Sequence, residues 1–184
     1  MIPGKRMNFK KEFWVLLLIF ILPVGLGTLF FYLNPSYFSQ NTVNYGELIR
    51  PVIMTEKSDI EVIGDDSLEG VWTLAYVTDS CDSLCDQAVE DVKTIRTLIN
   101  MDMRRIQRML ITKDGSMPQK DDENLIHASI NNEELLSQLA SFPKNSIFLI
   151  DPIGNFMLYY NPTDLNIKFV IKDLKRLLKY SRIG

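Results

Sequence analysis

The chain has 184 residues, of which 46% are hydrophobic and 23% are charged, and it contains two cysteines and one histidine. This composition excludes a disordered, collagen-like or disulfide-rich chain. The net charge of −3 argues against a nucleic-acid partner. The charge is unevenly distributed: residues up to Leu33 include four basic residues and one acid, which leaves 16 basic and 22 acidic residues, a net charge of −6, in the remainder.

The first long segment has the properties of a membrane anchor. Residues Phe13 to Leu33 form 21 consecutive positions without a charge, enough to cross a hydrocarbon core of roughly 30 Å as a helix. Trp14 and Tyr32 stand near its two ends, where amphipathic aromatic side chains favour the membrane interface. Pro23 is tolerated inside a membrane helix. We therefore predict a single-pass transmembrane helix over residues 13–33 that is embedded in the lipid bilayer.

The charges around this segment predict its orientation. Four basic residues precede it and the residues directly after it carry no charge, so the positive-inside rule predicts a cytoplasmic N-terminus over residues 1–12. Residues 34–45 are polar and without periodicity, which indicates a tether. Residues 46–184 are then a periplasmic domain on the outer side of the inner membrane. A cleaved signal peptide is the alternative, but the apolar run is long for one and no small-x-small cleavage site follows it.

The exported part alternates between strand-like and helix-like segments. An apolar stretch rich in β-forming residues, 70–77, precedes an amphipathic helix over about 82–101. There follow a strand over 105–112, a short helix opened by a capping box of Asn131 and Glu134, a hairpin of 146–151 and 156–160, and a helix from about 164 to 180. This alternation predicts an α/β sheet covered on both faces. A helix that begins at a cysteine pair after the first core strand predicts a thioredoxin-like sheet with flanking helices.

Cys81 and Cys85 form the one constellation in the sequence that could carry chemistry. Residues four apart on a helix share a face, with Cβ atoms roughly 5–6 Å apart. This is close enough for a disulfide after a small backbone adjustment, or for one soft metal ion. A helix N-terminus also favours the thiolate, which is the reactive and metal-binding form. A purely structural disulfide is the alternative, although closing so short a loop removes little chain entropy.

The neighbours of the pair along the chain are acidic. Asp79, Asp82 and Asp86 surround it, and no basic residue lies within seven positions on either side. Carboxylates disfavour a further anion, so we predict thiols that are weaker acids than those of a fast disulfide oxidant. The same negative field attracts cations. It favours copper(I) capture, or slow thiol exchange with a specific partner, over general oxidative folding.

These segments resemble the Sco/SenC/PrrC family of thioredoxin-like, membrane-anchored proteins. The similar segments are 44–48 with Pro51 (the opening segment of the family), 70–77 with the two cysteines (its first strand and CxxxC motif), 104–112 (the next strand), 147–154 (the late hairpin) and 173–184 (the tail of a subgroup associated with bacterial cytochrome oxidase loci). The resemblance implies copper binding and assembly of the copper centres of cytochrome c oxidase, with oxidase subunits or assembly proteins as partners. It implies Cys81 and Cys85 as copper ligands or as a redox pair.

Two positions depart from the family pattern. Asp86 stands where the family usually has a proline after the second cysteine, and the stretch 141–146, where the family has its third copper ligand, contains no histidine. His127 comes well before that stretch, and we expect it to be a surface or loop residue. Two thiolates suit linear copper(I), whereas copper(II) normally requires nitrogen or oxygen ligands. The sequence therefore favours thiol exchange or copper(I) binding over copper(II) storage.

Three other features have ordinary explanations. Met101, Met103, Met109 and Met117 are expected to fill gaps in the core rather than to bind copper. Four arginines are expected on a solvated helix end and strand edge: Arg96, Arg104, Arg105 and Arg108. The basic side of the last helix could contact anionic lipid or an oxidase subunit, and a solvated face explains it equally well.

The resulting hypothesis is a membrane-anchored Sco-like assembly factor for cytochrome c oxidase copper centres, acting through copper(I) handling or thiol–disulfide exchange at Cys81 and Cys85. As an enzyme it would be at most a thiol–disulfide oxidoreductase with a specific partner. The competing hypothesis is a non-catalytic, membrane-anchored scaffold with the same fold and inert cysteines. A thiol–disulfide enzyme of another pathway is disfavoured by the acidic neighbours of the pair.

Overall fold

The computed structural model describes residues 9–35, 37, 43–63, 69–113, 115–118 and 122–182. It contains an N-terminal helix and a compact folded unit that begins at Asn44, and each is described here by itself. Most of the predicted cytoplasmic N-terminus, including Lys5 and Arg6, lies outside the described residues, as does much of the predicted tether.

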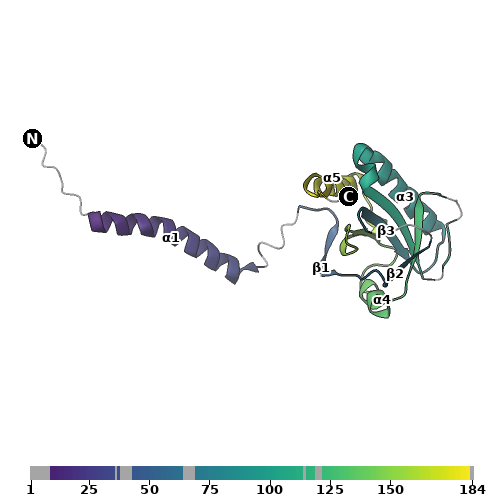
Figure 1. Cartoon of the computed structure of the whole chain (residues 1–184), viewed down its shortest axis with the longest axis horizontal. Helices are drawn as coiled ribbons and strands as arrows, with labels where there is room; N and C mark the ends of the chain where they lie inside the picture. The colour runs from purple at the N-terminus through teal and green to yellow at the C-terminus, as the bar shows by residue number, and fades with distance from the viewer. Residues whose placement is uncertain are drawn as a thin grey trace, which may run out of the picture. The chain divides into compact units, whose positions relative to one another are not determined.

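Helix α1 (Phe9–Leu33) is continuous and includes the predicted membrane span (Figure 1). It runs through Pro23 without a break. Its segment Lys10–Leu33 is long and apolar enough to cross a membrane, and nearly all of its described side chains are exposed. Its length and composition therefore suit the predicted membrane anchor.

The folded unit is built on one mixed sheet. Its elements are β1 (Glu47–Ile53), β2 (Ile60–Ile63), β3 (Trp72–Thr78), α3 (Ser83–Ile99), the 3-10 helix η1 (Asn100–Arg105), β4 (Ile106–Thr112), β5 (Leu125–Ile130), α4 (Glu133–Leu139), β6 (Ile147–Ile150), β7 (Phe156–Tyr160), the 3-10 helix η2 (Pro162–Asp164) and α5 (Ile167–Tyr180). The strand order is β1-β7-β6-β3-β4-β5-β2. β3, β4 and β5 run parallel, whereas β6 pairs antiparallel with β3 and forms the predicted hairpin with β7.

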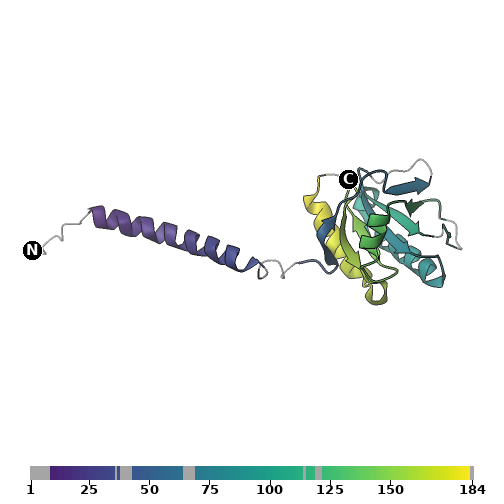
Figure 2. The same cartoon turned by 90° about the horizontal axis from the view of Figure 1, so that it is seen from below.

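Helices cover both faces of this sheet. Figures 1 and 2 show α3 and α5 on one face and α4 on the other. A hydrophobic core lies on each face of the sheet, and consecutive residues of β3 point alternately into the two cores. Leu74 and Tyr76 pack under α3 and α5, and Ala75 packs under α4. A strand buried on both faces must be apolar throughout. The continuous apolar run of residues 70–77 therefore allowed β3 to be predicted from the sequence. The predicted α/β architecture is confirmed.

Several predicted boundaries are wrong in detail. β1, β2 and β5 have no counterpart among the predicted strands. The first long helix ends at Ile99 rather than near Met101, because Asn100 adopts a φ of 64° and the chain continues as η1. The cap of α4 is Asn132, whose side chain accepts hydrogen bonds from the N–H groups of Glu134 and Leu135. Asn131, predicted to be that cap, instead donates to Glu61.

The methionine prediction holds at one position. Met109 is buried in the core under α4, whereas Met101, Met103 and Met117 have exposed side chains. Met101 and Met103 lie in η1, which has no buried residue, and Met117 lies in the segment after β4.

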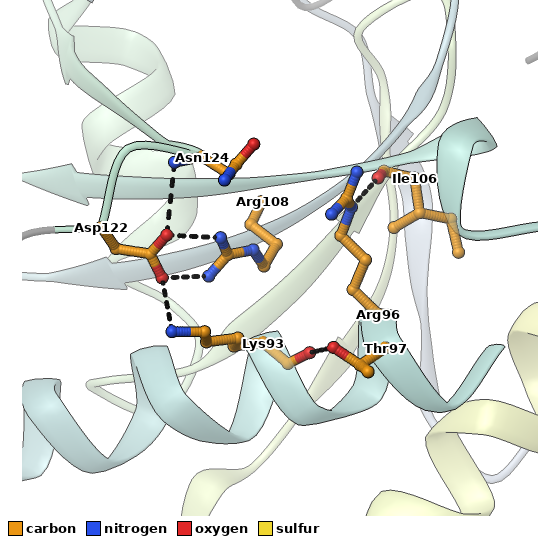
Figure 3. A network of polar contacts seen from close by, with 7 residues as sticks. All are labelled: Lys93, Arg96, Thr97, Ile106, Arg108, Asp122 and Asn124. Carbon is orange, nitrogen blue, oxygen red and sulfur yellow. Dashed lines mark hydrogen bonds and ion pairs between the residues drawn. The ribbon is translucent and has the colours of Figure 1, made fainter. Parts of the chain in front are cut away.

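The arginine prediction is wrong for Arg96, Arg105 and Arg108, whose side chains are bound within the fold, whereas Arg104 is exposed as predicted. Figure 3 shows Arg108 of β4 in a bidentate contact with Asp122, with both N···O distances at 2.8 Å. Lys93 of α3 lies 3.4 Å from the same carboxylate, and Arg96 donates to the carbonyl of Ile106 at 2.7 Å. Arg105 donates to the two carbonyls of Leu178 and Ser181. These groups tie α3 and the C-terminal segment to the sheet.

Candidate functional site

The loop between β3 and α3 carries both cysteines. β3 ends at Thr78 and α3 begins at Ser83, with Asp82 as its N-cap. The Asp82 carboxylate accepts hydrogen bonds from the N–H groups of Leu84 and Cys85, at 2.9 and 3.2 Å. Asp82 thus satisfies donors that an uncapped helix would leave for another anion.

Cys81 and Cys85 form a disulfide, with their Cα atoms 5.0 Å apart. Cys85 is fully buried in the core under α3 and α5, whereas Cys81 is half-buried and packs against the edge of that core. The predicted apolar stripe of the helix began at Leu84, but Leu84 is exposed and Cys85 takes the inward position. Of the two cysteines, Cys81 is therefore the more accessible residue.

A residue from another loop holds the backbone of Cys81. The N–H of Cys81 donates to the hydroxyl oxygen of Ser116 at 2.6 Å. The hydroxyl of Thr112, at the end of β4, donates to the carbonyl of Ser116 at 3.2 Å. Sequence reasoning missed Ser116, because no local pattern marks a lone serine in the segment after a strand.

Asp79 lies between two lysines that come from other loops. Its carboxylate is 2.7 Å from Lys113 Nζ and 3.2 Å from Lys144 Nζ. The hydrogen bond from Lys113, followed by the one from Lys144, lowers the pKa of Asp79. Basic residues are thus absent near the pair along the chain but present in space. The surroundings of the pair are therefore less anionic than the sequence indicates. The weak acidity of the thiols stays a prediction.

Residues 141–146 lie against the cysteine loop, where the family resemblance implies a copper-binding histidine. The hydroxyl of Thr78 donates to the side-chain oxygen of Asn145 at 2.8 Å, and Lys144 contacts Asp79. The stretch therefore contributes an amide and an ammonium group. A lysine ammonium group has no lone pair for a metal ion. Lys144 therefore does not replace the histidine as a ligand, and the stretch contacts the cysteine loop through polar side chains.

His127 does not join the cysteines. It lies half-buried in β5, where it pairs with Leu110 of β4 and Ile63 of β2. The predicted alternative of a loop residue is wrong, because His127 lies in a strand that was not predicted from the sequence, but the side chain is partly exposed as a surface residue would be. β4 separates β5 from β3, so His127 stands two strands away from the strand that leads to Cys81. Over the described residues, no three His, Cys, Asp or Glu side chains gather into a metal-binding group.

A hollow of about 130 Å³ adjoins the cysteine loop. Leu136 and Leu139 of α4 line it together with Asp79, Lys113 and Lys144. Its lining thus combines an apolar surface with both signs of charge, in reach of residues that precede Cys81. Neither cysteine lines this hollow.

Comparisons with solved structures identify the fold. Apo Sco1 from Thermus thermophilus is 14% identical, with a TM-score of 0.51 over 74% of this chain and 98% of that chain. Yeast Sco1 with copper bound is 12% identical, with a TM-score of 0.50 over 77% of this chain and 96% of that chain. No curated protein matches the sequence. At these identities the likeness shows the fold, and the predicted thioredoxin-like, Sco-type fold is confirmed. Residues 72–181 match a protein-family model, and the chain belongs to the family that this model describes, the transmembrane-like, thioredoxin-like, C-terminal domain family.

Proposed function

We propose that this protein is a membrane-anchored Sco-like assembly factor for the copper centres of cytochrome c oxidase. It acts through copper(I) handling or thiol–disulfide exchange at Cys81 and Cys85. The observation that carries the proposal is the disulfide at the strand-to-helix turn, in which Cys85 is buried and Cys81 is partly exposed. The shared fold adds support, since one of the similar structures is a Sco1 protein with copper bound.

The different exposure of the two cysteines supports different roles for them in thiol exchange. In the reduced form, the Cys81 thiolate attacks a disulfide of the partner, and one partner sulfur leaves as a thiolate. Cys85 then attacks the mixed disulfide at Cys81, which releases the second partner sulfur and restores the Cys81–Cys85 bond. Two electrons pass to the partner, whose cysteines take up two protons. An external dithiol must afterwards reduce the pair.

The same two sulfurs suit copper(I) as a cargo. Residues whose Cα atoms lie 5.0 Å apart can direct two thiolates to one ion, and a two-thiolate site matches the preference of copper(I) for soft ligands. The described residues supply neither histidine nor a third cysteine at this loop. We therefore propose copper(I), and not copper(II), as the ion that the pair transfers.

The proposed location is the inner membrane, with the N-terminus in the cytoplasm and the domain in the periplasm. The apolar helix α1 and the basic residues before it support this orientation. A disulfide at the site agrees with an oxidising compartment. The proposed partners are cytochrome c oxidase subunits or their assembly proteins, which present cysteines to be reduced or loaded with copper.

An anaerobic copper(I) titration of the reduced full chain in detergent micelles tests the metal role. We expect one copper(I) ion per chain, bound in competition with a chelator, and loss of this binding in the Cys81→Ser, Cys85→Ser double variant. The matched control is His127→Ala, which should titrate like the wild type because His127 lies two strands from β3. Identical titrations of the wild type and the double-Ser variant would remove the metal role.

The reduction potential of the pair tests the thiol-exchange role. A potential within the range of physiological dithiols supports exchange, whereas a disulfide far more resistant to reduction is structural. In the second case, with normal oxidase activity in a strain that carries the double-Ser variant, the inert scaffold is the correct function.

A further inference from the structure

The solvent-facing side of α5 is basic and aromatic. We define the α5 face as six exposed residues of this helix: Lys168, Phe169, Lys172, Lys175, Arg176 and Lys179. The helix Ile167–Tyr180 is described throughout, and its one acidic residue, Asp173, is only 2% exposed. The chain after Leu33 has a net charge of −6. The α5 face is therefore a positively charged surface on a domain whose net charge is negative.

Tyr45 extends the α5 face to the start of the folded unit. Its ring stacks on that of Phe169, with centroids 4.1 Å and planes 6° apart. Lys172 Nζ lies 5.3 Å from the centroid of Tyr45 and 5.4 Å from that of Phe169. The backbone N–H of Tyr45 donates to the Asp173 carboxylate at 2.8 Å. The point where the chain enters the domain is thus fixed on α5.

The chain between Tyr45 and α1 is short. Only residues 34–44 separate Leu33 from Tyr45, and even a fully extended segment of this length spans at most about 40 Å. If α1 crosses a bilayer, the α5 face stays close to the surface from which the chain emerges. A short tether of this kind makes docking intramolecular, so even weak contacts are populated.

We propose that the α5 face docks on anionic phospholipid headgroups of the leaflet from which the tether emerges. This inference rests on the membrane anchoring proposed above. Each basic residue near an anionic surface gains attraction to it, and the rings of Tyr45 and Phe169 are of the type that favours the interface. An anionic surface repels the acidic remainder of the domain, so this face is the one that can approach it. An acidic protein is the competing occupant.

Amine-labelling of the full chain in nanodiscs tests the docking. The chain is reconstituted in phosphatidylcholine, with or without phosphatidylglycerol, and acylation of each lysine is followed by mass spectrometry. We expect Lys168, Lys172, Lys175 and Lys179 to react several-fold more slowly with phosphatidylglycerol present, and high salt to abolish the difference. Lys57 and Lys144, whose side chains are 81% and 87% exposed outside α5, are internal controls that should react equally in both nanodiscs.

Charge reversal supplies a second arm. The K175E/K179E variant should lower the ratio of docked to free domain by at least about 30-fold, since the loss of each basic residue near such a surface costs about fivefold and each introduced carboxylate adds repulsion. The control variant K57E/K144E has the same change of net charge and should dock like the wild type. Equal labelling of α5 in the two nanodiscs overturns the proposal. So does protection that requires added oxidase, which would assign the face to an acidic protein. A chain that fails to co-purify with nanodiscs contradicts the anchor itself and is recognised separately.

Discussion

The hydroxyl oxygen of Ser116 lies 2.6 Å from the backbone nitrogen of Cys81 and accepts its hydrogen bond. The two residues come from different loops, and the carbonyl of Ser116 is held in turn by the hydroxyl of Thr112 at the end of β4. The position of the half-exposed cysteine therefore depends on the segment after β4 as well as on its own loop. We expect this contact to limit how readily an attacking thiolate reaches the Cys81 sulfur.

Replacing Ser116 with alanine should release that constraint. The variant loses one hydrogen bond to a partly buried backbone N–H, which reduces the free energy of unfolding by about 1 kcal/mol. We expect an exogenous dithiol to reduce its disulfide faster than that of the wild type. The control is Ser137→Ala on α4, which removes a hydroxyl bonded to its own helix. Equal reduction rates for S116A and the wild type would show that Ser116 has no influence on access to Cys81.

Asp79 and Asp82 should both slow the reaction of the Cys81 thiol in the reduced protein. A negative charge near a thiol disfavours the thiolate, which is the reactive form, so Asp79→Asn and Asp82→Asn should each speed alkylation of the reduced chain at neutral pH, by up to about tenfold. Asparagine remains a good N-cap, so Asp82→Asn changes the charge without removing the cap of α3.

The rate of alkylation of the reduced chain, followed over a range of pH, measures this effect. Asp102→Asn serves as the control, because Asp102 lies in η1 at the other end of α3. If both variants alkylate with the wild-type pH profile, the acidic neighbours do not govern the reactivity of the pair.

The contact between Arg108 and Asp122 should make stability depend on acid. Hydrogen bonds from Arg108 hold the pKa of Asp122 far below its ordinary value of 3.8. Because the folded-state pKa is lowered, the contact stabilises the fold fully above pH 3.8, and this stability is lost as the pH falls below that value. Asp122→Asn should cost about 3 kcal/mol at pH 7, since it leaves a buried guanidinium without its charge partner.

Urea unfolding at pH 7 and at pH 3 checks this prediction. The wild type should lose more of its free energy of unfolding than Asp122→Asn over this interval, so the two proteins converge in acid. The half-exposed pair of Arg105 and Asp102 is the comparison, and Asp102→Asn should cost less than about 1 kcal/mol. Parallel stability curves for the wild type and Asp122→Asn would contradict the assigned role of the carboxylate.

The central part of the fold could be predicted because a strand that is buried on both faces appears in the sequence as a continuous run of apolar residues. β3 and the β6–β7 hairpin have such runs, and helix α3 has apolar residues at helical spacing. The strands that were not predicted lack a run of this kind. In the edge strand β1 most positions are at least partly exposed, β2 has four residues, and β5 contains His127, so none shows a pattern longer than chance.

The site could be predicted in part. The two cysteines are visible in the sequence because they are the only ones, and their place after a buried strand locates them at a helix start. Lys113, Ser116 and Lys144 meet the cysteine loop through tertiary contacts, which leave no local signal. Asp173 did leave one: it is an acid between Val170 and Leu174, on the apolar stripe of an otherwise basic helix.

The buried carboxylate of Asp173 should control how firmly the chain entering the domain is held. Its Oδ2 accepts hydrogen bonds from the N–H groups of Tyr45 and Gly46, at 2.8 and 2.9 Å, and from the hydroxyl of Tyr160 at 3.2 Å. Burial, and then the charge of Asp173, raises the pKa of Tyr160, so this hydroxyl stays a donor. Asp173→Ala leaves these donors without their acceptor and should cost about 3 kcal/mol, with faster proteolysis around residues 44–46.

Two further variants separate this contact from a general loss of packing. Tyr160→Phe removes one of the three donors and should cost about 1 kcal/mol. Gly46→Ala keeps every polar group but would place a Cβ atom 2.5 Å and 2.7 Å from atoms of the buried Tyr160 ring, so it should release the same segment by steric conflict. We expect Asp173→Ala to lose more of its free energy of unfolding in urea than Tyr160→Phe, and to be cleaved faster in limited proteolysis. If Asp173→Ala is as stable and as protease-resistant as the wild type, the carboxylate does not hold the entering chain, and Tyr45 is positioned by its stacking on Phe169 alone.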